Sequence, residues 1–348
     1  MPQIIEIDGS YLEAGGQIIR TAVGLSAVTG KPCRVFNIRS GRPKPGLMAQ
    51  HLTGIEACAK ICDAKLKGAA LHSKELEFHP GKIKGGEYKI DIGTAGSIPL
   101  VLQTLVIPAL HAEKKVMLDL IGGTHVSWSP TIDYFRHVFC DFMKKVGVNV
   151  QVDILKYGFY PKGGGQVRVE IQPSEVTPIR LVEREELSRI DVWSVASETL
   201  KAKNVAERQV DGVKKLLKLT PESNIHIDYA DSLSPGSSVY VHAHYLNCKL
   251  GASAIGERSK KAEAVGEEAA RELEPQMRTA ACVDKHMADQ ILPYMALAAE
   301  KGRSEVSVAE ITNHCRTNIW VIEKFLPVKF EIVEKKGEPG IIRCEQKK

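Results

Sequence analysis

Apolar residues recur every three or four positions in several stretches of this 348-residue chain, and a run of alternating apolar and polar residues follows each of them. The first spacing predicts an amphipathic helix, and the alternation predicts a half-buried strand. Three segments have the helical spacing: residues 15–28, 96–111 and 287–300. Each is followed by a turn and a strand-like segment, at 33–38, 116–121 and 305–311. A polar loop and a second helical segment complete each unit, at 46–63, 131–146 and 318–326.

The repetition predicts an α+β fold of sheet-and-helix modules, of βαβαβ type, packed around a common core. The polar loops fall at corresponding places in the three units, namely at residues 39–45, 122–130 and 312–316. They would converge if the modules are arranged around one axis.

The rhythm changes between residues 183 and 277. Strand-like segments at 189–197, 224–229 and 238–246 alternate there with helix-like segments at 206–217 and 259–273. This pattern predicts a smaller α/β domain inserted at 183–277. The main domain would then be discontinuous and consist of residues 1–182 and 278–348.

Composition sets broad limits. The chain is 43% hydrophobic and 26% charged, as in a soluble globular protein, and its net charge of +5 permits an anionic partner without requiring one. Its eight cysteines form no CxxC pair, which favours reduced thiols. The N-terminus lacks the pattern of a signal peptide, and the longest apolar run, at 98–110, is too short to cross a bilayer. We therefore expect a cytoplasmic protein that does not bind membranes.

One histidine lies in the third polar loop, in the run Asn313-His314-Cys315-Arg316-Thr317. Thr317 is well placed to cap the helix predicted at 318–326, which would leave His314 and Arg316 beside free backbone N–H groups. Such a position attracts phosphate. His314 is therefore a candidate nucleophile or acid/base, although a simple turn residue explains it equally well.

Two further segments carry candidate chemistry near the N-terminus. Arg39, Arg42 and Lys44 place three cations within six residues of a stiff loop, and the polar pair Gln50-His51 follows. Arginine suits phosphate oxygens, but a solvated basic loop is the alternative. Glu13 precedes a Gly-Gly pair and, one helical turn on, Arg20. This group could hold a metal and a phosphate, or simply begin a helix.

Three other segments have ordinary explanations. The glycine-rich stretch 158–165 suits either close approach to a ligand or a hairpin turn. Asp284 reads as a helix cap with polar first-turn residues. His242 and His244 alternate in a strand and share a face, but with no third ligand in view we do not expect a metal there.

Taken together, these segments resemble the RNA 3′-terminal phosphate cyclases. The matching stretches are residues 8–20, 38–52, 93–103, 122–124, 158–165, 288–290 and 314–319. They cover both ends of the chain and skip 183–277, which in the family is a smaller inserted domain. The resemblance implies that ATP adenylates a histidine and that AMP then passes to an RNA 3′-phosphate. Attack by the neighbouring 2′-OH gives a 2′,3′-cyclic phosphodiester and releases AMP.

The resemblance also implies roles by position. His314 matches the family's nucleophile, and Glu13 matches a carboxylate at a divalent metal, Mg²⁺ or Mn²⁺, and the ATP phosphates. The ATP-contacting positions correspond to Arg20, Gln103, His286, Met287, Ala288, Asp289 and Gln290. Arg20, Arg39, Arg42, Gln50 and His51 match the cluster around the phosphates and the RNA end. His286 stands where relatives often carry an aromatic residue, which puts its stacking on adenine in doubt.

Two other functions compete with the cyclase. A non-catalytic cyclase-like factor of ribosome assembly shares the fold but lacks the catalytic histidine, so His314 favours the enzyme. An enolpyruvyl transferase is built from similar modules, but its motifs have no counterpart here. The expected partners are RNA 3′-phosphate ends. The sequence does not decide whether the protein forms a homo-oligomer.

Overall fold

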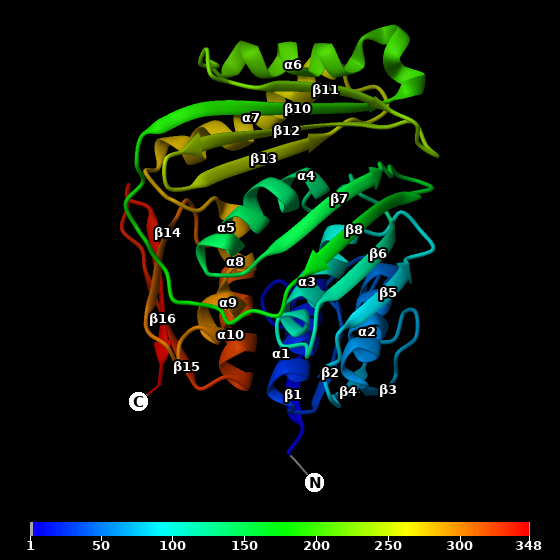
Figure 1. The fold of residues 1–348 in the computed structure, drawn as a ribbon, viewed down its shortest axis with the longest axis vertical. Helices are drawn as coiled ribbons and strands as arrows, with labels where there is room; N and C mark the ends of the chain where they lie inside the picture. Colours follow the sequence, from blue (N-terminus) through cyan, green and yellow to red (C-terminus); the bar gives the residue numbers. More distant parts are fainter. Residues whose placement is uncertain (1–2, 348) are drawn as a thin grey trace.

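The computed structural model describes residues 3–347, and within them the strands form four four-stranded sheets. The predicted α+β fold of repeated sheet-and-helix modules is confirmed. Figure 1 shows three of these sheets around a central group of helices and the fourth as a layer above them.

The first two sheets repeat one design, in which a parallel pair is extended by antiparallel strands. The first has the order β1-β2-β4-β3 and consists of β1 (Ile5–Asp8), β2 (Cys33–Phe36), β4 (Leu76–His79) and β3 (Lys65–Lys67). Its helices are α1 (Gly16–Thr29) and α2 (Ala49–Cys62). The second has the order β5-β6-β8-β7, with β5 (Gly86–Asp91), β6 (Val116–Gly122), β8 (Gly165–Ile171) and β7 (Val150–Lys156). Its helices are α3 (Ile98–Ala109), α4 (Ile132–Tyr134) and α5 (Cys140–Lys145), the last two joined by a π-helical turn, Phe135–Phe139.

The third sheet has the order β15-β16-β14-β9 and is interrupted along the chain. It consists of β15 (Val328–Val333), β16 (Gly340–Gln346), β14 (Ser304–Val308) and β9 (Arg180–Leu181). Its helices are α8 (Lys285–Gln290), α9 (Leu292–Leu297) and α10 (Asn313–Phe325). Strand β9 pairs in parallel with β14, so the chain enters this sheet before residue 187 and returns to it after residue 278.

The fourth sheet is formed by the stretch that leaves the third one. It has the order β11-β10-β12-β13, with β11 (Ile225–Ala230), β10 (Leu187–Ser197), β12 (Ser237–Tyr245) and β13 (Lys249–Ile255). Helices α6 (Val205–Leu216) and α7 (Ala262–Arg278) pack on one face of it, and a 3₁₀ turn, Glu198–Lys203, precedes α6. Figure 1 shows the opposite face turned toward α4 and α5.

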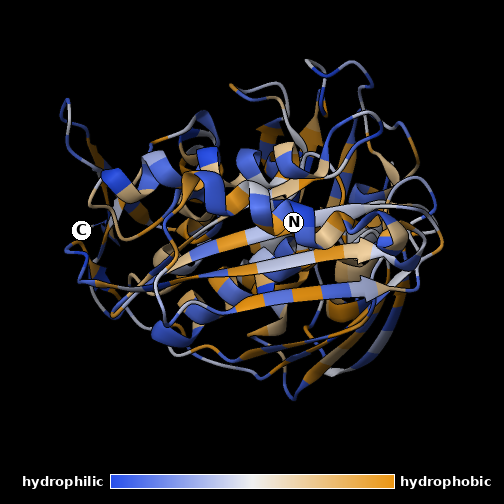
Figure 2. Cartoon of the chain, turned by 90° about the horizontal axis from the view of Figure 1, so that it is seen from above, coloured by the Kyte–Doolittle hydropathy of each residue, from blue (hydrophilic) through white to orange (hydrophobic). Residues whose placement is uncertain are grey.

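Burial follows the hydrophobic pattern of each element. Figure 2 shows hydrophobic residues alternating with hydrophilic ones along the strands, as expected of sheets with one face in the core. The central helices are more apolar: in α3 nearly every residue is buried, because α1, α2 and the second sheet surround it. No helix within residues 3–347 is long and apolar enough to cross a membrane.

Two predictions about helices were wrong. Helix α10 begins at Asn313 instead of residue 318, and its cap is Thr312, whose Oγ1 accepts a hydrogen bond from the Cys315 N–H at 3.3 Å. Thr317, the predicted cap, is a buried residue inside this helix. The single helix expected at 287–300 is divided into α8 and α9, with Pro293 in the first turn of α9. Strand β13 was not predicted at all.

Candidate active site

The site lies at the N-terminus of α1, where Gly15 and Gly16 let the side chains of Arg42 and His51 approach the backbone. A Cβ on Gly16 would lie 2.1 Å from the Nε2 of His51, and one on Gly15 would lie 3.2 Å from a terminal nitrogen of Arg42. Gly15 occupies the cap position and offers no side chain to the first N–H groups of α1. The free N–H groups of this turn and the helix dipole favour an anion.

His314 faces this turn from the first turn of α10. Its Nδ1 lies 2.9 Å from the Oε1 of Gln17, and its Nε2 lies 3.9 Å from a carboxylate oxygen of Glu13. An amide oxygen only accepts, so His314 donates from Nδ1 and keeps the lone pair on Nε2. Burial lowers the pKa of His314 below its ordinary value, although the charge of Glu13 opposes this. The imidazole is therefore neutral near pH 7, with Nε2 free to act as a nucleophile.

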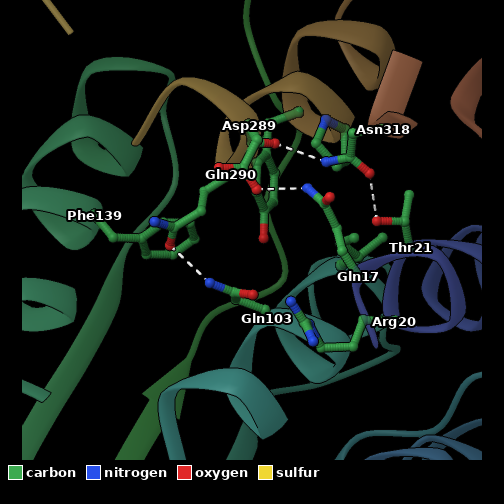
Figure 3. A pocket seen from close by; sticks show the side chains of 11 residues that line it. Gln17, Arg20, Thr21, Gln103, Phe139, Asp289, Gln290 and Asn318 are labelled. Carbon is green, nitrogen blue, oxygen red and sulfur yellow. Dashed lines mark hydrogen bonds between the residues drawn. The ribbon is translucent and has the colours of Figure 1, made fainter. Parts of the chain in front are cut away.

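A network of amide side chains fixes this arrangement (Figure 3). The Nε2 of Gln17 donates to a carboxylate oxygen of Asp289 on α8. Asn318 on α10 donates from Nδ2 to the Asp289 carbonyl at 2.7 Å and accepts from the Thr21 hydroxyl at 2.6 Å. Both amides are buried, and together they join α1, α8 and α10.

Next to the network is a pocket with a polar wall and an apolar wall (Figure 3). The polar wall includes Arg20, Gln103 and Gln290, and Gln103 donates to the Oε1 of Gln290 at 2.9 Å. The apolar wall consists of Ile107, Phe139, Pro293 and Tyr294. A site with a few directed polar groups and an apolar side is typical of pockets that bind a small molecule.

Arg20 and Asp289 face this pocket with altered pKa values. Burial lowers the pKa of Arg20 to about 10, and the nearby charge of Asp289 opposes the shift. Burial likewise raises the pKa of Asp289 to about 7, opposed by the charge of Arg20. The Nε of Arg20 is buried and has no hydrogen-bond partner anywhere in residues 3–347. A buried donor without a partner is costly, which makes Arg20 a good candidate for a ligand contact.

The basic loop contributes its two arginines differently. Arg42 lies 3.4 Å from the Glu13 carboxylate and is partly exposed beside His314. Arg39 donates to the carbonyls of Lys44 and Gly46, at 2.7 and 2.8 Å, and so also holds the loop closed.

Gln50 and His51 lie near the start of α1, and each already accepts a hydrogen bond from a backbone N–H group. The Oε1 of Gln50 accepts from the Ser97 N–H at 2.9 Å, at the start of α3. His51 is buried, and its Nδ1 accepts from the Met48 N–H at 3.1 Å. Burial, together with the charges of Arg20 and Arg39, lowers the pKa of His51 to about 3, so its ring is neutral.

The structure places three of the predicted ATP-contacting side chains outside this pocket. His286 is exposed and bonds Glu272 of α7 at 2.8 Å. Its side chain is only half exposed, and the covered part of the ring disfavours the charged form. The bond to Glu272 outweighs this effect and raises the pKa of His286 above its ordinary value. The side chains of Met287 and Ala288 are buried and do not line the pocket.

Two other expectations concern the neighbourhood of His314 and α8. Arg316, expected beside the anion site, instead pairs with Glu334 after β15. Because α10 begins five residues earlier than predicted, residues 314 and 316 both lie in the helix. Residues two apart on a helix do not share a face, so Arg316 points away from His314. Asp284 is a cap, as predicted: its carboxylate accepts from the N–H groups of His286 and Met287.

Sequence reasoning missed two residues that organise the site. Gln17 lies within the matching stretch 8–20 but was given no role, and Asn318 was expected only as the first residue of a helix. The available signal was their spacing. Gln17 precedes Thr21 by one turn of α1, and His314 precedes Asn318 by one turn of α10, so each pair shares one face.

Glu13 is the residue best placed to hold a divalent metal ion. Its carboxylate is 28% exposed and makes only the long contacts to Arg42 and His314, so oxygen lone pairs remain available. Mg²⁺ and Mn²⁺ prefer such oxygen ligands and keep several waters. Glu13 offers one carboxylate to such a cation, and waters would supply the other ligands.

These features define an α+β protein of repeated modules whose polar site is assembled from helices at both ends of the chain. Comparison with known proteins specifies it further: residues 11–332 match the profile of the RNA 3′-terminal phosphate cyclase family. The chain belongs to this family.

Its relatives match over nearly their full lengths. Proteins named RNA 3′-terminal phosphate cyclase are 43% identical in Methanopyrus kandleri, with 97% of this chain and 98% of the relative covered, and 44% identical in Pyrococcus furiosus, with 99% of each covered. Another, in Methanosarcina barkeri, is 44% identical over 96% of this chain and 98% of the relative. Among solved structures, the enolpyruvyl transferase NikO from Streptomyces tendae gives a TM-score of 0.29 at 13% identity, over 48% of this chain and 33% of NikO, which is too weak to bear on fold or function.

Proposed function

We propose that this protein converts an RNA 3′-terminal phosphate to a 2′,3′-cyclic phosphodiester at the expense of ATP, through a covalent histidine–AMP and an RNA-adenylate. Membership in the RNA 3′-terminal phosphate cyclase family and relatives of that name at 43–44% identity support the overall reaction. The mechanism rests on the geometry around one imidazole.

The observation that carries the proposal is the orientation of His314. Its Nδ1 is bound to Gln17, and its Nε2 faces Glu13 and, beyond it, Arg42. A neutral imidazole with one nitrogen held by an acceptor presents the other as a nucleophile, and covalent catalysis divides one difficult transfer into easier steps.

The first step joins His314 to AMP. The Nε2 lone pair attacks the α-phosphorus of ATP, a P–N bond forms, and the P–O bond to the β-phosphate breaks with release of pyrophosphate. Positive charge develops on the imidazole ring as this happens. Because the Oε1 of Gln17 accepts the Nδ1–H, that bond strengthens as the ring becomes cationic.

Two further transfers complete the reaction. An oxygen of the RNA 3′-phosphate attacks the phosphorus of AMP, which forms a P–O–P anhydride and breaks the P–N bond, so that His314 is restored. The 2′-OH then attacks the 3′-phosphorus and expels AMP, and its proton leaves to solvent. The 2′-OH is what distinguishes RNA from DNA at this step.

We assign the remaining residues by their positions. Arg42 and the N–H groups at the start of α1 face the anionic groups beside His314, and Arg39, Gln50 and His51 shape that surface. Arg20, Gln103, Asp289 and Gln290 line the adjoining pocket, to which we assign the adenine of ATP; its free volume of about 20 Å³ means that side chains must move apart to admit the base. Glu13 would hold Mg²⁺ or Mn²⁺, which offsets charge on the phosphates.

The experiment is transfer of label from [α-³²P]ATP to the protein in the presence of Mg²⁺ or Mn²⁺. We expect an acid-labile, alkali-stable adduct that His314→Ala abolishes and that the matched variant His79→Ala, at a distant half-buried histidine, retains. Equal labelling of His314→Ala and the wild type would refute the assignment. An RNA 3′-phosphate should become resistant to phosphatase, and equal conversion of a 2′-deoxy end would exclude the cyclisation step.

A further inference from the structure

The fourth sheet carries a second cluster of metal-binding side chains, on the face turned toward the π-helical turn Phe135–Phe139. Asp191 on β10 is the direct cross-strand partner of His242 on β12, and Arg189 is the partner of His244. Residues two apart on a strand point to the same face, so both histidines lie beside Asp191. One ligand atom from each of Asp191, His242 and His244 lies within 4.8 Å of the other two.

The histidines of this cluster lack the partners that buried polar groups require. His242 and Asp191 are each 2% exposed, and neither ring nitrogen of His242 has a hydrogen-bond partner within the described chain. The closest approach is 3.5 Å, between Nε2 and the Asp191 carboxylate. The Nδ1 of His244 is also buried and unpaired within residues 3–347. A buried polar group without a partner is costly, and an ion bound to one nitrogen of each ring would remove part of that cost.

We propose that Asp191, His242 and His244 form a binding site for a divalent transition-metal ion, with Zn²⁺ as the preferred ion. Two imidazoles and one carboxylate suit Zn²⁺ better than the Mg²⁺ or Mn²⁺ expected at Glu13, which favour oxygen ligands. Three protein ligands leave a fourth position for water. Side-chain movements of about 1 Å bring the donors to zinc-bond distances, and the half-exposed His244 ring has room for them.

Neighbouring groups hold the ligands in a form that can bind metal. Arg189 donates to both oxygens of Asp191, at 2.8 and 3.1 Å, and Asn224 donates to the same carboxylate from its backbone at 2.8 Å. Such contacts orient a ligating carboxylate.

The cations near the cluster are already paired. Arg189 is neutralised by Asp191 itself, and Lys249, the cross-strand partner of His244, bonds Asp141 of α5 at 2.9 Å. Next to the cluster the pairing of β10 with β12 shifts register between Leu187 and Arg189. An ion held between these strands would fix them at this irregularity, where the backbone ladder is weakest.

The test is Zn²⁺ binding by metal-stripped full-length protein, measured by titration calorimetry and by competition with a chromophoric chelator. We expect one Zn²⁺ per chain with Kd below about 1 μM, and Co²⁺ at the same site should give visible absorption bands. His244→Gln and Asp191→Asn should weaken this site at least about tenfold, the size of effect typical of removing support from a metal centre.

Two matched variants make the result specific. His226→Gln removes an exposed histidine that stacks on Trp193 of the same sheet and should bind Zn²⁺ like the wild type. Glu13→Gln should also keep the site, which separates it from the metal bound with ATP. Zn²⁺ should raise the Tm of wild type and His226→Gln but not of His244→Gln. The proposal would be overturned if metal-stripped wild-type protein binds no added Zn²⁺, or if His244→Gln binds Zn²⁺ as tightly as the wild type.

Discussion

The hydrogen bond from His314 to Gln17 gives the most direct test of how this site prepares its nucleophile. Gln17→Leu keeps the volume of a buried side chain but removes the oxygen that accepts the Nδ1–H at 2.9 Å. A bond between neutral groups contributes about 0.5–1.5 kcal/mol, and this one strengthens as the ring becomes cationic. We therefore expect the variant to lose about 1–2 kcal/mol of transition-state stabilisation, which corresponds to a roughly 5- to 30-fold slower adenylation.

The assay is single-turnover transfer of α-label from saturating ATP to the protein, so that weaker ATP binding does not contribute. Gln172→Leu is the matched control, because Gln172 follows the inner strand β8 of the second sheet and bonds Glu170 there, with no contact to His314. Gln17→Leu protein that labels as fast as the wild type would show that the Nδ1 contact does not orient His314 for attack.

A second substitution at this position tests the same bond through pH. Gln17→Glu retains an acceptor for Nδ1 but places a negative charge beside it, which stabilises the imidazolium and raises the pKa of His314. In the wild type burial lowers this pKa, so labelling should persist into mildly acidic solution. The variant should lose activity at a higher pH than the wild type and recover it in alkaline solution. An unchanged pH profile would contradict the assigned proton position.

Three further perturbations address the surroundings. Glu13→Gln should raise the Mg²⁺ concentration needed for half-maximal labelling by about tenfold, because a metal ligand loses its charge; an unchanged metal requirement would remove Glu13 from that role. Asp289 has a pKa near 7 when folded and 3.8 otherwise, so the folded protein binds the extra proton and stability falls as pH rises from about 4 to 7. Asp289→Asn should remove this dependence and be more stable at pH 8 by on the order of 1–2 kcal/mol in urea unfolding, whereas an unaltered pH slope would refute the shift. Gly16→Ala places a methyl group 2.1 Å from the His51 ring and should lower stability by about 1–3 kcal/mol; normal stability and labelling would show that His51 moves freely.

The sequence was sufficient for the repeated modules because their signals are local. The strand predicted at 116–121 and the helix predicted at 15–28 each bury the side dictated by their periodicity, and both lie within one residue of the observed bounds. Strand β13 was missed because small residues, among them Gly251, Ala252 and Ser253, occupy both of its faces. Leu250, Ala252 and Ala254 pack toward the helices while Gly251 lies against Tyr134 and Val138, so no alternation is visible.

The start of α10 was mispredicted because two threonines compete as caps. Thr312 and Thr317 both precede polar residues, and a cap is defined by the φ/ψ of its own residue, which the sequence does not state. The burial of Cys315 decides the matter, since it extends the apolar face of α10 by one turn. His314 therefore lies inside the first turn of α10 and not in a loop before it.

The contacts that hold His314 were harder to predict, because they join residues almost 300 positions apart. Gln17 and Asn318 resemble ordinary polar helix residues until α1 and α10 are placed side by side. Amides suit this position for a physical reason. Each has a donor and an acceptor, so Gln17 can bind the His314 Nδ1–H and Asp289 at once, and Asn318 can bind Thr21 and the Asp289 backbone.

A carboxylate in place of the Gln17 amide would bring a charge next to His314, the proposed nucleophile. It would raise the pKa of His314, hold the ring protonated and remove the lone pair on Nε2. Asp289 instead reaches His314 only through Gln17, and the nearer carboxylate, Glu13 at 3.9 Å from Nε2, does not outweigh the effect of burial on the pKa of His314. The neutral amide of Gln17 therefore orients the imidazole without protonating it, which suits the role that we propose for His314.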